Sequence, residues 1–163
     1  MSVVQQAELI AAAKKVRENA QAQFSGFKVG AALRSRSGRI YTGCNIENAT
    51  YGLTVCAERV AIFKALSEGE SPGSFDAMAV VADTDAPTPP CGACRQLLWE
   101  FCGDIPIVMA NLKGGNEEHR TSALLPKAFD ARFFRPKSSE ESRLSVFPGL
   151  VRVVSSGNPA EPL

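Results

Sequence analysis

Two short apolar runs constrain the fold more than any other feature of the sequence. Residues 77–82 read AMAVVA and residues 105–110 read IPIVMA. Runs of this length without polar alternation are typical of strands that are buried on both faces. The segment between them, 91–101, has the length and pattern of a helix. Since a strand, a helix and a strand in one sheet form a right-handed parallel crossover, the sequence predicts an α/β fold.

Periodicity predicts further elements on both sides of this unit. Apolar residues recur near a 3.6-residue period over about residues 4–22, which indicates an amphipathic helix. Residues 27–33 and 40–46 alternate in side-chain type, and the turn between them predicts an antiparallel hairpin. A second helix is expected at about 55–67, and a short polar strand at about 118–121.

Length and composition indicate one globular domain with a short extension. The chain has 163 residues, of which 45% are hydrophobic and 21% charged. We predict that residues 1–134 form the domain and that 135–163, where Pro and Ser are frequent, form an extension that is partly ordered at best. The net charge of +1 argues against a large surface for nucleic acid. The sequence also shows no membrane span or secretory signal, so a cytoplasmic protein is expected.

The cysteines carry the first indication of chemistry. There are five, and an odd number cannot all pair within one chain, so metal ligands or reactive thiols are expected in a reducing compartment. Cys91 and Cys94 form a Cys-x-x-Cys motif at the start of one predicted helix, and Cys56 begins another. Three thiolates would hold a zinc ion and leave its fourth position open, as in catalytic zinc sites. The other two, Cys44 and Cys102, are expected to be small buried residues.

Charged residues beside these cysteines suggest how such a site would work. Glu58 stands two residues after Cys56, where it could exchange protons with water at the metal. By itself, a glutamate in a first helical turn more often only complements the helix dipole. Arg59 and Arg95 each lie near a ligand in sequence, and we expect both to donate to sulfur and tune the metal. His119, the only histidine, lies in a polar run and is assigned no role.

The composite of Cys-x-Glu and a later Pro-Cys-x-x-Cys is the signature of zinc deaminases. Over about residues 3–134 the chain resembles the small homotetrameric cytidine deaminases. The resemblance rests on four segments in family order: FSGFKVGAAL, GRIYTGCNIENATYGLTVCAERVAIFKALSEG, PPCGACRQLLWEF and LLPKAF. It implies a three-layer α-β-α sandwich with a mixed sheet of about five strands, and homotetramers with shared active sites.

The resemblance also implies the metal and the catalytic group. Cys56, Cys91 and Cys94 would be the zinc ligands. Glu58 would be the proton shuttle, and would hold the pyrimidine ring nitrogen and the exocyclic amine. The backbone N–H of Ala57 would meet the pyrimidine carbonyl.

Further positions of the resemblance concern the nucleoside. Asn45 and Glu47 would hydrogen-bond the ribose hydroxyls, and Phe27 would pack on the base. Three residues would reach a neighbouring subunit's site: Ala49, Tyr51 and Phe129. Where the family often has a tyrosine, this chain has Phe24, which removes a phenol hydroxyl.

These features favour hydrolytic deamination of cytidine and 2′-deoxycytidine to the uridine products, as in pyrimidine salvage. One alternative is a relative that acts on N4-substituted cytidines or on a cytosine-nucleoside antibiotic. A second is a nucleic-acid deaminase, which would need an electropositive channel. A third, from another class, is a structural zinc module that only binds a partner, which would need a fourth ligand.

Overall fold

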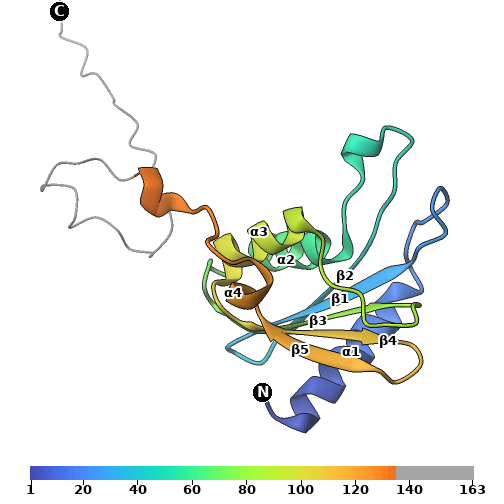
Figure 1. Ribbon diagram of the computed structural model, residues 1–163, viewed down its shortest axis with the longest axis horizontal. Helices are drawn as coiled ribbons and strands as arrows, with labels where there is room; N and C mark the ends of the chain where they lie inside the picture. Colours follow the sequence, from blue (N-terminus) through green and yellow to red (C-terminus); the bar gives the residue numbers. More distant parts are fainter. Residues whose placement is uncertain (135–163) are drawn as a thin grey trace, which may run out of the picture. The chain divides into compact units, whose positions relative to one another are not determined.

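The computed structural model describes residues 1–134 (Figure 1). Met1–Ala128 form one compact unit, and the described residues that follow belong to a second unit. The predicted domain boundary at residue 134 stays a prediction, and the predicted extension, 135–163, lies outside the described residues. No helix within this described part is long and apolar enough to cross a membrane.

A mixed five-stranded sheet forms the centre of the first unit. Its strands are β1 (Val29–Ser35), β2 (Ile40–Cys44), β3 (Phe75–Ala82), β4 (Pro106–Asn111) and β5 (Asn116–Arg120). They lie in the order β2-β1-β3-β4-β5, and β3 and β4 are parallel, as the apolar runs predicted. The pairs β1–β2, β1–β3 and β4–β5 are antiparallel. Since two antiparallel pairings separate β2 from β3, these two strands and β4 run in the same direction.

Helices cover both faces of this sheet, so the predicted three-layer α-β-α sandwich is confirmed (Figure 1). On one face α1 (Val3–Arg17) buries Leu9 and Ala13 against small side chains of β1, β3 and β4. On the other face α2 (Ala57–Ser67) and α3 (Gly92–Cys102) share a core with larger sheet residues. The short helices are η1 (Tyr51–Leu53) and α4 (Thr121–Leu124) in this unit and η2 (Ala131–Phe134) in the second.

A glycine lets α2 lie directly on the sheet. A Cβ atom at Gly43 of β2 would come within 2.5 Å of the Ala57 carbonyl oxygen and of the Ala61 backbone nitrogen. Real side chains do not tolerate such a distance from backbone atoms. The absence of a side chain at Gly43 therefore fixes the first turn of α2 against the end of β2.

Two predicted boundaries near the N-terminus were wrong. The first helix ends at Arg17 rather than near residue 22, because the chain turns there and Gln21 pairs with the backbone of Asn45 and Glu47. Phe27 lies outside β1, which begins at Val29. The hairpin ladder stops at this point because the Asn45 side chain, in place of a strand backbone, accepts the Val29 N–H.

Two other boundaries moved for related reasons. The second strand ends at Cys44 rather than residue 46, because the backbone of Ile46 pairs with Val55 and not with β1. The polar strand β5 ends at Arg120, since Thr121 begins α4.

A buried phenol lies near the C-terminal end of α2. Tyr41 is 2% exposed, and its hydroxyl donates to Glu70 Oε1 at 2.9 Å. Burial, and then the hydrogen bond to Glu70, raise the pKa of Tyr41 above its ordinary value. The folded state therefore favours the neutral phenol, which stabilises the fold below the unfolded pKa of about 10.

We expect this stabilisation to be lost as the pH rises through the raised pKa of Tyr41. Tyr41 and Tyr51 are the only two tyrosines. In a Tyr51→Phe variant, an ultraviolet titration of phenolate should therefore report Tyr41 alone, with a midpoint above 10. Circular dichroism in the same samples should show unfolding that accompanies the ionisation. A phenol that titrates at its ordinary value in a still folded chain would contradict this account.

Candidate active site

Three segments meet at one edge of the sheet. The carboxyl ends of β2 and β3 lie at this edge, because the two strands run in the same direction. The chain after β2 leads through η1 to Cys56, and the chain after β3 leads to Cys91. The segment that precedes the antiparallel strand β1 lies at the same edge. Ligand sites of open α/β sheets form at such carboxyl ends.

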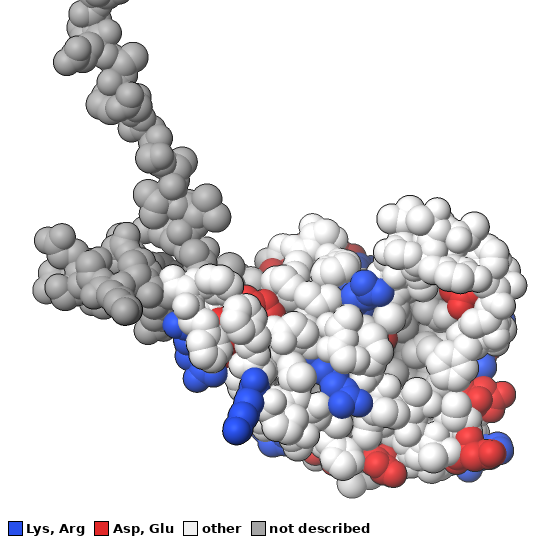
Figure 2. All heavy atoms as spheres, turned by 45° about the horizontal axis from the view of Figure 1, so that its top comes forward, with Lys and Arg blue, Asp and Glu red and all other residues white. Residues whose placement is uncertain are grey.

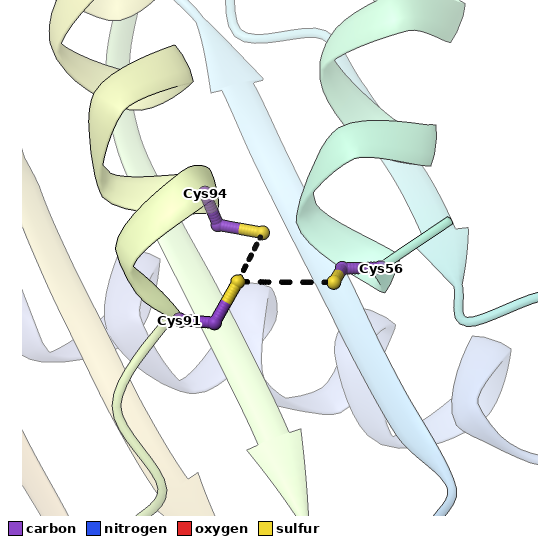
Figure 3. A group of neighbouring side chains, drawn as sticks. All are labelled: Cys56, Cys91 and Cys94. Carbon is purple, nitrogen blue, oxygen red and sulfur yellow. Dashed lines mark hydrogen bonds between the residues drawn. The ribbon is translucent and has the colours of Figure 1, made fainter. Parts of the chain in front are cut away.

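Cys56, Cys91 and Cys94 come together at the N-termini of two helices (Figure 3). Cys56 is the N-cap of α2, Cys91 is the N-cap of α3, and Cys94 lies in the first turn of α3. The Sγ–Sγ distance is 3.9 Å between Cys56 and Cys91 and 3.4 Å between Cys91 and Cys94. All three sulfur atoms lie within 4.8 Å of one another. Both helix dipoles therefore stabilise negative charge at the same point.

The three sulfur atoms fit a zinc ion. With bonds of about 2.3 Å, a tetrahedral zinc separates its sulfur ligands by roughly 3.8 Å, close to the spacing observed. Among the described residues, no fourth Cys, His, Asp or Glu joins this cluster. The only histidine, His119, lies on β5, where it contacts Glu117. A donor set of three thiolates with one position left for solvent is that of a catalytic rather than a structural site.

Neighbouring groups favour the thiolate form of Cys56 and the neutral form of Cys94. A hydrogen bond from the Cys94 thiol, followed by the hydrogen bond and charge of Arg59, lowers the pKa of Cys56 to about 5. In return, the bond to Cys56 and burial raise the pKa of Cys94. Arg59 Nη2 donates to Cys56 Sγ at 3.5 Å and to the Thr54 carbonyl at 2.9 Å. The guanidinium thus lies where it can offset the charge of the ligands.

Arg95 does not make the contact that the sequence led us to expect. Its Nε donates to the Pro90 carbonyl at 2.7 Å, and its Nη1 donates to the Leu124 carbonyl at 3.0 Å. The side chain of the residue after Cys94 leaves α3 in another direction than the thiol, because successive helical residues differ by about 100° around the axis. The observed bonds therefore tie the turn before Cys91 to the end of α4.

Glu58 lies beside the cysteines in the first turn of α2 and is only 4% exposed. Burial, followed by the negative charge of Cys56, raises the pKa of Glu58 to about 6. Hydrogen bonds from its own backbone N–H and from the Cys94 thiol offset part of this effect. A carboxyl group with this pKa can take up and release a proton near neutral pH, as a general acid–base requires.

A cavity of about 300 Å³ lies at the same edge of the sheet. It lies between the segment before β1 and the loop after β2, and is lined by Phe24, Ser25, Glu47, Tyr51 and Thr54. Thr54 links the cavity to the metal-binding group, since Arg59 donates both to its carbonyl and to Cys56.

The two polar residues expected to bind a sugar hold the cavity's walls. Asn45 is buried; its Oδ1 accepts the Val29 N–H and its Nδ2 donates to the Phe27 carbonyl, both at 2.8 Å. Glu47 Oε2 accepts the N–H groups of Phe24 at 2.9 Å and of Ser25 at 3.1 Å. These bonds fasten the segment before β1 to the segment after β2.

The remaining expected contacts fall into three groups. Phe27 is 41% exposed beside Ser25, and Ala57 begins α2, where backbone N–H groups have no intrahelical acceptor. Ala49 and Tyr51 are exposed on the loop that carries η1, and Tyr51 packs edge-to-face on Phe24. Phe129 belongs to the second unit, where it stacks on Phe133. Their roles toward a substrate stay predictions.

Sequence reasoning missed two cavity residues, Ser25 and Thr54. Neither belongs to a motif with metal or acid–base chemistry, and a serine or threonine in a loop is ordinary. They line the cavity only because the segment before β1, which carries Ser25, folds next to the loop after β2, which carries Thr54.

Comparisons with known proteins agree with this geometry. Residues 3–110 match the family described as "Cytidine and deoxycytidylate deaminase zinc-binding region". A cytidine deaminase from Sporosarcina psychrophila is 56% identical over 123 residues, 75% of this chain and 89% of the relative. The crystal structure of cytidine deaminase from Burkholderia pseudomallei superposes with a TM-score of 0.75 at 48% identity, over 79% of this chain and 100% of the other. A blasticidin-S deaminase from Bacillus cereus is 32% identical over 60% of this chain and 74% of its own length.

If the three thiols form the metal site, the purified chain should hold about one zinc per molecule after dialysis. A Cys91→Ala variant should retain only a small fraction of that amount, because two thiolates cannot replace three. Elemental analysis measures both. The matched control is Cys102→Ala, which removes a thiol from the core near the end of α3. Equal zinc in the wild type and Cys91→Ala would refute the assignment.

Proposed function

The chain belongs to the family of cytidine and deoxycytidylate deaminases, and from that premise we propose that it hydrolyses cytidine and 2′-deoxycytidine to the corresponding uridines. The observation that carries this proposal is the buried carboxyl group of Glu58 beside three clustered thiols. A protein that only binds a partner does not need a proton-transferring group at that position, whereas a hydrolase needs one.

Zinc and Glu58 would each supply part of the chemistry. When bound, zinc supplies Lewis acidity and lowers the pKa of water toward 7. Glu58 accepts one proton of the attacking water and passes it to ring nitrogen 3 as the water oxygen adds to carbon 4 of the pyrimidine. Glu58 then takes the remaining proton from that oxygen and delivers it to the departing amine, which leaves as ammonia as the carbonyl forms. Burial, which raises the pKa of Glu58, favours a carboxyl group that can make both transfers near neutral pH.

The chain's other residues would bind and orient the nucleoside. Glu47, as a carboxylate, can accept hydrogen bonds from sugar hydroxyls, and Asn45 supports the same wall of the cavity. Phe27 offers an exposed aromatic ring for the base. The Ala57 N–H, free of an intrahelical acceptor, suits the pyrimidine carbonyl. Arg59 would moderate the charge of the ligands through Cys56.

Other functions find less support. The face shown in Figure 2 carries scattered basic and acidic side chains on a mostly uncharged surface, whereas a nucleic-acid deaminase needs a basic channel. A structural zinc module would be closed by a fourth ligand, and the cluster has three among the described residues. The match to blasticidin-S deaminase favours a cytosine-nucleoside antibiotic as the substrate of a second candidate function, at lower identity and coverage. We further assign the protein to cytoplasmic pyrimidine salvage.

A homotetramer with shared active sites fits the exposed surface near the cavity. Phe24, Tyr51 and Leu53 are 51%, 77% and 64% exposed. The loop that carries η1 projects from the edge of the sheet (Figure 1). A second copy packed on these side chains would bury apolar area and shield the cavity from water.

Replacing Glu58 by Gln tests the reaction. The amide keeps the size of the side chain but cannot carry the proton, so kcat for cytidine should fall roughly 10⁴-fold. The zinc content should not change. Glu68→Gln, at the other end of α2, is the matched control and should keep its activity. Substantial turnover by Glu58→Gln would remove this residue from the mechanism.

A charged side chain introduced on the loop that carries η1 tests the proposed homotetramer. The wild type should sediment with four times the mass of one chain, and Leu53→Arg should give smaller species with reduced activity, because the arginine would be buried unpaired at the contact. Val3→Arg, at an exposed apolar position of α1, should leave the mass unchanged. A wild-type monomer with full activity would overturn the proposal of shared sites.

A further inference from the structure

The hydroxyl group of Ser25 connects the two walls of the cavity. It donates to Glu47 Oε1 and accepts the Phe27 backbone N–H at 2.9 Å. Ser25 itself lines the cavity and is exposed. One side chain therefore bonds both to the residue proposed to bind the sugar and to the residue proposed to face the base.

Glu47 depends on this segment for its orientation. The Ser25 hydroxyl is the largest cause that lowers the pKa of Glu47, and the N–H groups of Phe24 and Ser25 add to it. The carboxylate accepts three hydrogen bonds from the segment. Since a carboxylate has about four acceptor positions, one remains for a donor that enters the cavity.

We propose that Ser25 is a positioning residue that determines the preference for substrates with 2′ or 3′ sugar hydroxyls, by holding Glu47 oriented toward the cavity. This inference rests on the proposed function, because it concerns the nucleoside of that reaction. Without the Ser25 hydroxyl, Glu47 can rotate toward solvent. This change weakens binding of the sugar hydroxyls, while Phe27 and the groups that react at carbon 4 keep their places.

The chain provides a matched pair for comparison. At the far end of α2, the Ser74 hydroxyl donates to Glu70 Oε2 at 2.9 Å, and this bond is likewise the largest cause that lowers the pKa of its glutamate. Ser74 does not line the cavity. Ser74→Ala therefore removes the same kind of bond without touching the proposed site.

The test measures kcat and KM of the zinc-loaded enzyme for cytidine and for 2′,3′-dideoxycytidine, which lacks the ribose diol. The wild type should have the lower KM for cytidine. Ser25→Ala should raise that KM roughly tenfold, equivalent to about 1.4 kcal/mol, with kcat within about twofold. The KM for 2′,3′-dideoxycytidine should change little, because that nucleoside has no 2′ or 3′ hydroxyl for Glu47 to bind. Ser25→Thr, which restores the hydroxyl, and Ser74→Ala should both keep the KM of the wild type.

The outcomes distinguish a failure of the role proposed for Ser25 from a failure of the proposed function. A wild type that does not deaminate cytidine defeats the proposed function. A wild type that prefers cytidine, combined with a Ser25→Ala variant that loses equally on both substrates, defeats only the role of Ser25. If Ser25→Ala does not fold, Ser25→Cys supplies the same comparison, since a thiol has similar size but is a weak donor.

Discussion

The requirement that three sulfur atoms share one small volume governs the rest of the structure. Thiolates repel one another, and here each lies at the start of a helix whose backbone N–H groups and dipole favour negative charge. Arg59 adds a positive charge at 3.5 Å from Cys56. The arrangement depends on α2 and α3 packing side by side on one sheet face with their N-termini at the same edge. Gly43 allows the close approach that places α2 there.

A second constraint gives the cavity its shape. The backbone of Ile46 and its neighbours pairs with Gln21 on one side and with Val55 on the other. Side chains add to this backbone pairing, because Asn45 and Glu47 accept hydrogen bonds from backbone N–H groups of Val29 and Phe24. Glu47, which lines the cavity, is thus held by the same bonds that organise the loops. This explains how a site built largely on loops keeps a defined geometry, since the buried and satisfied Asn45 beside it is costly to disturb.

The predicted elements show where periodicity succeeds and where it fails. The parallel crossover was predictable, because strands buried on both faces have continuous apolar runs such as those of β3 and β4, and a helix-length segment lies between them. The end of α1 was not, since residues after Arg17 continue the apolar period but turn to pair with the segment after β2. Phe27 also fits a strand pattern, yet it precedes β1 because the Asn45 side chain replaces the ladder there. In both cases a contact distant in sequence decided against a local preference.

The sequence by itself determined which residues can hold a metal and carry a proton. The spacing of Cys91 and Cys94 at a helix start lets two thiols reach one ion, and Glu58 follows Cys56 within one helical turn. Only the tertiary structure decided that Cys56 joins them, since that contact depends on where β2 and β3 end. It also separated two arginines that look alike in sequence: Arg59 bonds a ligand sulfur, whereas Arg95 bonds two carbonyls. The physical reason is that spacing fixes directions within one helix, while the partner that a side chain meets depends on how the elements pack.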